Sequence, residues 1–130
     1  MQTLFHVIIS SFLLCATAAW TQEKPRTIDF TQVLLDATGR PFKASPTTAP
    51  LTLQDVSIES LDGVLDADRQ TPPTPEEKFL YDSLARKIYH NKAAVLTAAE
   101  INLLEQRIGK AYGAAVVGAA WRLLDPAQVK

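Results

Sequence analysis

The sequence predicts a mainly α-helical fold, a small domain of about four helices with an N-terminal β-hairpin. Two observations support this fold class. A threonine followed three residues later by an acid, which is the pattern of a helix start, occurs at Thr52, Thr74 and Thr97. Apolar residues then recur at helical spacing behind each of these starts. The 130 residues are long enough for one domain.

Residues 1–19 differ in kind from the rest of the chain. They contain no Lys, Arg, Asp or Glu, and an apolar run from Val7 ends in the small residues Ala18 and Ala19. We interpret this segment as a signal peptide cleaved near Ala18 or Ala19, which predicts an exported protein, periplasmic or extracellular. Two alternatives remain open, because no basic residue precedes the run. One is an uncleaved short anchor, which would be the protein's contact with a membrane, and the other is a misassigned start of a cytoplasmic protein.

The composition limits the classes of partner and of chemistry. The chain has 13 basic and 14 acidic residues, so neither a polyanion nor a polycation is indicated as a partner. The hydrophobic fraction of 47% is ordinary for a globular protein. The one cysteine, Cys15, lies within the leader. Removal of the leader would therefore exclude disulfide and thiol chemistry.

The first part of the mature chain is predicted to be extended. Residues 20–26 form a polar tether, and 27–125 form a single domain. Apolar and polar residues alternate at the start of 27–42, and a turn that ends in Gly39 follows, so we predict a β-hairpin over 27–42. Residues 43–50 contain two prolines and read as a loop.

The first two helices are predicted over 52–61 and 75–90. The first begins with Thr52 as its N-cap and stops at Asp62-Gly63. The second begins with Thr74-Pro75, an N-cap followed by a first-turn proline. Its apolar stripe consists of Leu80, Leu84 and Ile88, flanked by Tyr81, Ala85 and Tyr89. We assign no element to 64–71.

The last two helices are predicted over 98–112 and 114–124. In the first, Ile101, Leu104, Ile108 and Ala111 form a buried stripe, and the charged residues, Glu105 and Arg107 included, are assigned mainly to the other faces. Gly113 is expected to end this helix in the left-handed conformation. The second helix is apolar nearly all round, with Arg122 as its one charge, and is expected to be largely buried.

No catalytic, cofactor-binding or metal-binding residue is predicted. His90 has no second histidine or cysteine near it in the sequence, so we interpret it as a solvated residue at a helix end. The acids Asp62, Asp66 and Asp68 lack the glycine and glutamate of an EF-hand loop and read as solvated acids. Glu76 and Glu77 are adjacent at a helix N-terminus, where both are structurally useful, so they do not indicate an acid/base pair.

A nucleic-acid partner is not expected. Arg86, Lys87, His90 and Lys92 form a modest basic patch, but a recognition helix needs several polar and basic residues, and 114–124 carries a single arginine. The candidate interface residues are Trp121, Tyr112 and Val117, because they accompany a helix of small cross-section and a tryptophan is a good interface anchor. The partner is a protein, either another chain or a second copy of this one.

The chain resembles small proteins encoded in the structural regions of tailed phages and prophages. The resemblance covers about 27–124 and rests on Thr27–Phe30, Leu35–Pro41, Leu51–Val56 and Leu96–Ile101 with Arg107–Gly113. It implies an assembly or tail-chaperone-like role through protein contacts, without an active site. We therefore predict a non-enzymatic, exported protein that acts by protein contact. The alternatives are a cytoplasmic phage-type assembly factor with a misassigned start, and a small exported ligand binder or enzyme.

Overall fold

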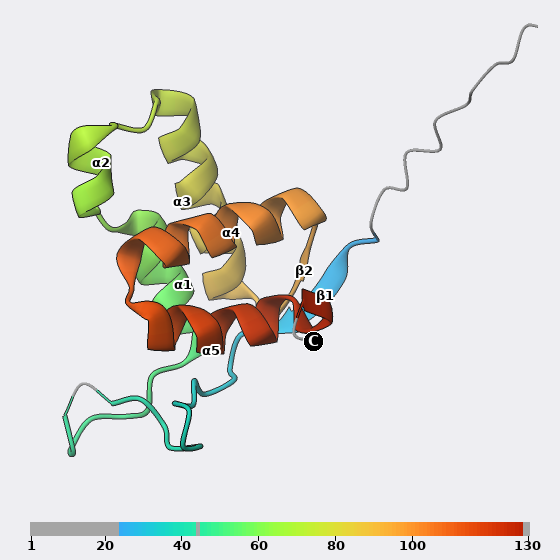
Figure 1. Cartoon of the computed structure of the whole chain (residues 1–130). Helices are drawn as coiled ribbons and strands as arrows, with labels where there is room; N and C mark the ends of the chain where they lie inside the picture. The colour runs from blue at the N-terminus through green and yellow to red at the C-terminus, as the bar shows by residue number, and fades with distance from the viewer. Residues whose placement is uncertain (1–23, 44, 129–130) are drawn as a thin grey trace, which may run out of the picture.

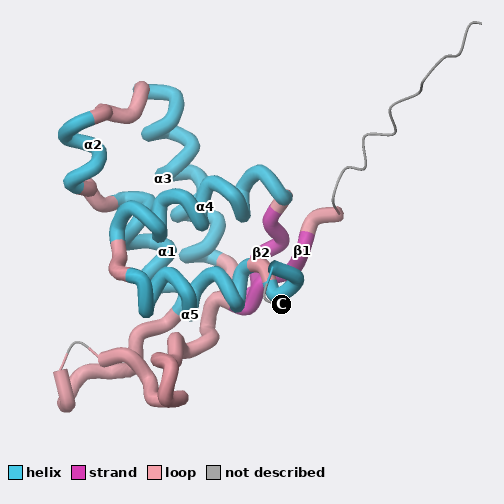
Figure 2. Tube along the Cα trace, in the orientation of Figure 1, coloured by secondary structure: helices cyan, strands magenta, loops and turns pink. Residues whose placement is uncertain are grey.

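The computed structural model describes residues 24–43 and 45–128. The predicted signal peptide, its cleavage site at Ala18 or Ala19 and most of the predicted tether lie outside these residues. Along the described chain the elements are β1 (Arg26–Asp29), α1 (Leu53–Asp62), α2 (Asp66–Gln70), α3 (Pro75–His90), β2 (Ala93–Leu96), α4 (Ala98–Ala111), α5 (Ala114–Leu124) and a short 3₁₀ turn, Pro126–Gln128. The predicted fold class is confirmed: the domain is mainly helical and includes a two-stranded antiparallel sheet (Figures 1 and 2).

Helix α1 is the central element of the helical part. It packs against α3, α4 and α5, while α2 and the start of α3 extend away from the centre (Figure 1). The face that α1 buries includes two serines as well as apolar residues: Leu53, Val56, Ser57, Ser60 and Leu61. Small side chains on a buried face let neighbouring helices approach closely, which suits a helix that has three of them around it.

The three predicted helix starts are confirmed. Thr52, Thr74 and Thr97 each accept a hydrogen bond from the backbone three residues later, and the acid at that position accepts from the threonine N–H. Each is thus a complete capping box. The observed helices begin and end within one residue of the predicted bounds. The helix α2 was not predicted, and it is short and buries no residue.

The sheet pairs two segments far apart in the sequence. Arg26 lies opposite Leu96 and Ile28 opposite Ala94, in antiparallel register. Ile28, Ala94 and Leu96 are buried on one face of this sheet, whereas Thr27 and Val95 point outward and are exposed. Period-two alternation of this kind is what a half-buried strand requires. The structure thus differs from the predicted hairpin over 27–42 in the position of the second strand, which follows α3.

Two local features explain why β1 does not pair with a second strand within the predicted hairpin, 27–42. The Asp29 carboxylate accepts from the Thr31 N–H at 2.9 Å, a turn that ends β1. The predicted turn near Gly39 does form, with Gly39 at φ +82. Its two arms meet in a single bridge, Leu35 with Pro41. The ladder does not extend beyond this bridge, because the Leu34 N–H donates to the carbonyl oxygen of Leu51 at 2.9 Å and not to that of Phe42.

The end of α4 and the burial of α5 correct two expectations. Gly113 has φ −76 and is the N-cap of α5, not a left-handed residue. The chain leaves α4 in an extended conformation at Tyr112, because α5 begins directly afterwards. The buried residues of α5 are Ala119, Ala120 and Leu124, and its other side is in part exposed. No helix among the described residues has the length and apolar character needed to cross a bilayer.

Candidate functional site

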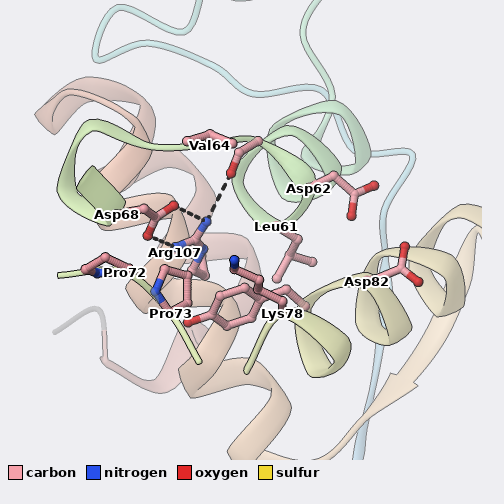
Figure 3. Close-up of a pocket in the computed structure, with 11 residues that line it drawn as sticks. Leu61, Asp62, Val64, Asp68, Pro72, Pro73, Lys78, Asp82 and Arg107 are labelled. Carbon is pink, nitrogen blue, oxygen red and sulfur yellow. Dashed lines mark hydrogen bonds and ion pairs between the residues drawn. The ribbon is translucent and has the colours of Figure 1, made fainter. Parts of the chain in front are cut away.

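A cavity of about 550 Å³ lies between α1, α3, α4 and the segment that carries α2 (Figure 3). Arg107 and Asp68 lie on one side of it, and Asp62 and Asp82 on the other. The lining residues are Leu61, Asp62, Gly63, Val64, Asp68, Pro72, Pro73, Lys78, Tyr81, Asp82 and Arg107. Among them are five charged side chains and several apolar ones, a mixture that is typical of binding sites.

Arg107 is held at the base of this cavity by three segments. Its Nε donates to the carbonyl oxygen of Ser60 at 3.0 Å, and Nη2 donates to that of Gly63 at 3.2 Å. Its two Nη groups also donate to the Asp68 carboxylate at 2.7 and 3.1 Å. The guanidinium carbon lies 4.4 Å from the ring centroid of Tyr81. With 2% of the residue exposed, Arg107 is a buried charge whose donors are nearly all satisfied.

Asp68 attaches α2 to the rest of the domain. Besides its ion pair with Arg107, its carboxylate accepts from the Leu65 N–H at 2.9 Å and so caps α2. The hydrogen bonds from Arg107 hold the pKa of Asp68 below its ordinary value, against the opposing effect of burial. Because α2 buries no residue, this carboxylate is its principal anchor. The ion pair with Arg107 therefore helps to set the position of one cavity wall.

Gly63, which ends α1, also fixes this wall. A Cβ atom there would lie 2.5 Å from the carbonyl oxygen of Glu59, so any larger residue would push the chain outward. The same glycine presents its own carbonyl oxygen to Arg107. The backbone at the α1 end is thus shaped by close contact rather than by a positive φ, since the φ of Gly63 is −72.

The rim of the cavity is in part apolar and open to solvent. Val64 is 81% exposed, and Pro72, which also lines the cavity, is exposed as well. On the opposite side the carboxylate of Asp82 accepts from Arg86 Nε at 2.8 Å. Asp62 and Lys78 form no ion pair with another described residue. The rim therefore offers apolar surface at the mouth of a hollow, and a contact at this place would bury it.

The predicted interface residues lie elsewhere, around α5. Trp121 is 37% exposed, and its Nε1 donates to the carbonyl oxygen of Glu105 at 3.2 Å. The Tyr112 hydroxyl donates to the Glu59 carboxylate, and burial together with this bond raises the pKa of Tyr112 well above its ordinary value. Val117 is half-buried against the core. All three thus make contacts within the domain, and they do not line the cavity.

Glu105 is a second buried charge on α4. It is 7% exposed, and its Oε1 accepts no hydrogen bond from any described residue. Burial, and next the neighbouring Asp125, raise the pKa of Glu105, while Arg26 opposes them. Arg26 is already engaged by Asp125, with Nη1 to Oδ1 at 3.2 Å. This carboxyl group is therefore close to an ion pair without being part of it.

The structure brings some of the other residues considered from the sequence together in the cavity, and leaves the rest apart. His90 is exposed at the end of α3, with its ring edge-to-face with Tyr89. Asp62 and Asp68 both line the cavity, whereas Asp66 lies outside it. Of the two adjacent acids, Glu77 completes the cap of α3. Within 24–43 and 45–128 no three His, Cys, Asp or Glu residues gather as metal ligands would.

Sequence reasoning missed the buried state of Arg107 and Glu105. Both were assigned mainly to the solvent side of α4, and that assignment was wrong. Arg107 lies three residues after Leu104 and next to Ile108, at the edge of the apolar stripe, so its position carried a signal. The position was overlooked because a charged residue is assigned to solvent when apolar and polar residues are read as a pattern.

Comparison of the chain with models of protein families, with curated proteins and with solved structures finds no match.

Proposed function

We propose that this protein is a non-enzymatic module that acts by protein contact and uses the cavity beside Arg107 as its contact site. The observation that carries the proposal is the exposed apolar rim of this cavity, where Val64 is 81% exposed. A partner segment that inserts one apolar side chain would cover Val64, Pro72 and Pro73 and contact Tyr81. Burial of such surface is the main source of binding free energy between proteins.

Most charged groups around the cavity are bonded to one another, which supports a structural role for them rather than a catalytic one. Arg107 and Asp68 neutralise each other at the base, and Asp82 is engaged by Arg86. Side chains that act as nucleophiles or as general acids and bases have to be free to change their protonation or bonding during a reaction. Here Asp68 and Asp82 are held by arginines, and they stabilise the cavity wall. Asp62 and Lys78 remain to orient a partner at the rim.

A site-specific photocrosslinking experiment tests this contact. A photoreactive residue is placed at Val64 or at Lys78 on the rim, and at exposed Thr38 as the control. We expect a discrete protein adduct from the rim positions and not from Thr38. The adduct should be lost when Pro73→Asp places a charge in the cavity wall. Equal adduct yields at Val64 and Thr38 would contradict the proposal.

The size of the cavity supports a small-molecule ligand as a second candidate. A volume of about 550 Å³ lies within the range of roughly 300–1,000 Å³ of known ligand pockets. Screening of a fragment library by NMR against the same protein separates the two candidates. Saturable shifts at Tyr81 and Lys78, with no adduct at Val64, would favour a ligand binder.

We further propose that the protein is exported through its leader, residues 1–19. Expression from the native start, followed by cell fractionation and intact-mass measurement, tests this directly. We expect a mass loss that matches cleavage near Ala18 or Ala19 and recovery outside the cytosol. Full-length protein in the cytosol would instead favour the phage-type assembly factor, whose partners would be sought among phage structural proteins.

A further inference from the structure

The outward face of α3 carries a regular stripe that does not take part in the hydrophobic core. Three residues spaced seven apart, Glu76, Ser83 and His90, form its central row. Phe79 and Arg86 lie along one side of this row, and Leu80 and Lys87 along the other, each pair again seven apart. Spacing by sevens keeps residues on one face of a helix, so these seven form one continuous stripe.

The stripe leaves large apolar side chains uncovered. Phe79 is 70% exposed and Leu80 is 55% exposed, and both line a shallow hollow of about 420 Å³ with Pro75 and Glu76. Leu80 was expected in the buried stripe of this helix, but the buried residues are Tyr81, Leu84, Ala85 and Ile88. At about 100° per residue, Phe79 points away from that buried face. It is also absent from the lining of the cavity beside Arg107.

The charges along the stripe change sign from one end to the other. Glu76 lies in the first turn of α3, whereas Arg86, Lys87 and His90 lie towards its end. The ion pair of Arg86 with Asp82 uses its Nε, so its two Nη groups are left to make other contacts. Lys87 is held by Glu100 of α4, with Nζ to Oε2 at 3.0 Å. Such a stripe is complementary to its own reversed copy.

We propose that α3 pairs with α3 of a second copy in an antiparallel arrangement, with the two-fold axis at Ser83. In this arrangement Glu76 lies opposite the partner's His90, Phe79 opposite the partner's Arg86, and Leu80 opposite the partner's Lys87. The three pairs come into register together, as a two-fold, isologous interface requires. The small Ser83 at the axis allows close approach, and a guanidinium over a phenyl ring is a favourable contact.

The expected dimer is weak. Helix α3 has 16 residues, which corresponds to a length of about 24 Å. One helix pair of this length buries less than the roughly 1,600 Å² of a standard interface. We therefore expect association at about 100 µM rather than at nanomolar concentration. This inference uses a different side of α3 from the cavity, so it can fail while the proposed contact site stands.

Sedimentation equilibrium of the purified protein over increasing concentration tests the pairing. Glu76→Lys or His90→Glu, each alone, should weaken self-association about tenfold, because like charges or mismatched groups then face each other. A mixture of these two variants should associate again, since each supplies the charge that the other needs. Leu35→Lys, which changes an apolar residue that is 48% exposed and lies outside both the stripe and the cavity, is the matched control and should leave association unchanged.

A crosslink at the axis gives an independent measurement. In a Cys15→Ser background, Ser83→Cys should form a disulfide-linked dimer rapidly on mild oxidation, and Thr38→Cys should not. A protein that stays monomeric at several hundred micromolar, or a dimer that Leu35→Lys breaks and Phe79→Lys does not, would overturn the proposal. Restored association in the mixed variants would be hard to explain by any other interface.

Discussion

Helix α4 carries two buried charges two positions apart, and the domain treats them in opposite ways. Arg107 is 2% exposed and satisfied by Asp68 and by the carbonyl oxygens of Ser60 and Gly63. Glu105 is 7% exposed, and its Oε1 has no hydrogen-bond partner among the described residues. The first charge connects segments that would otherwise separate, whereas the second lies unneutralised beside an existing ion pair. A buried charge that lacks its partners is therefore expected to cost stability.

The largest effect is expected from Arg107→Met. The substitution leaves Asp68 without its cation and two backbone carbonyl groups without their donor. Loss of one partner of a buried pair costs about 3–5 kcal/mol. Urea unfolding of the purified protein measures this difference. Arg69→Met, at an exposed arginine of α2, is the matched control and should cost less than about 0.5 kcal/mol. A loss below about 1 kcal/mol for Arg107→Met would show that the pair is not an anchor.

A smaller and pH-dependent loss is expected from Asp68→Asn. Hydrogen bonds to a charged group contribute about 1.5–3 kcal/mol, and the substitution removes the charge while it keeps the shape. Because the folded pKa of Asp68 lies below 3.8, its stabilisation is complete above that pH and is lost as the pH falls through the folded value. The free energies of unfolding of the two proteins should thus differ most at pH 7, and the difference should shrink as the pH falls below 3.8. A constant difference would exclude ionised Asp68 as the cause.

The contrast between these regions also shows which parts of the fold are readable from the sequence. The helix starts at Thr52, Thr74 and Thr97 were predicted because a capping box lies within four consecutive residues. The pairing of β1 with β2 and the clamp around Arg107 were not, since their partners are far away in the sequence. Arg107 meets Asp68 and Ser60 at separations of 39 and 47 residues, and no local pattern reports such contacts.

The same difference between local and long-range contacts decides which parts of the candidate site could be predicted. The exposed state of His90 and the solvated Asp66 followed from the sequence, because each depends on its immediate neighbours. The cavity did not follow, because its walls come from four helices and from the turn at Pro72-Pro73. The exposed Phe79 was hidden for a further reason. A helix with one buried stripe gives no signal for a second, outward stripe unless charge and spacing are read together.

Glu105→Gln should stabilise the protein, in contrast to the changes around Arg107. An amide has no charge to desolvate, so we expect a gain of about 1 kcal/mol near pH 7. The pKa of Glu105 is raised above 4.5 in the folded state, so its ionisation lowers stability as the pH rises through the folded value. Thermal unfolding should show the gain at pH 7 and its disappearance at pH 4. A loss of stability at pH 7 would mean that the carboxylate has a favourable partner.

The smallest effect is expected from Trp121→Phe, which tests whether the α5 side of α4 depends on polar contacts at all. The substitution keeps an aromatic ring on α5 and removes the Nε1 donor to the Glu105 carbonyl oxygen. That oxygen belongs to a helix backbone and can accept within α4, so the loss should be about 0.5–1 kcal/mol. Urea unfolding measures it, with Glu105→Gln as the background in a double-mutant cycle. Additive effects would place the Trp121 bond apart from the Glu105 carboxyl group. Coupling above about 0.5 kcal/mol would instead mean that the ring shields this carboxyl group from water. In that case α5 would maintain the unneutralised charge that distinguishes this side of α4 from the side of Arg107.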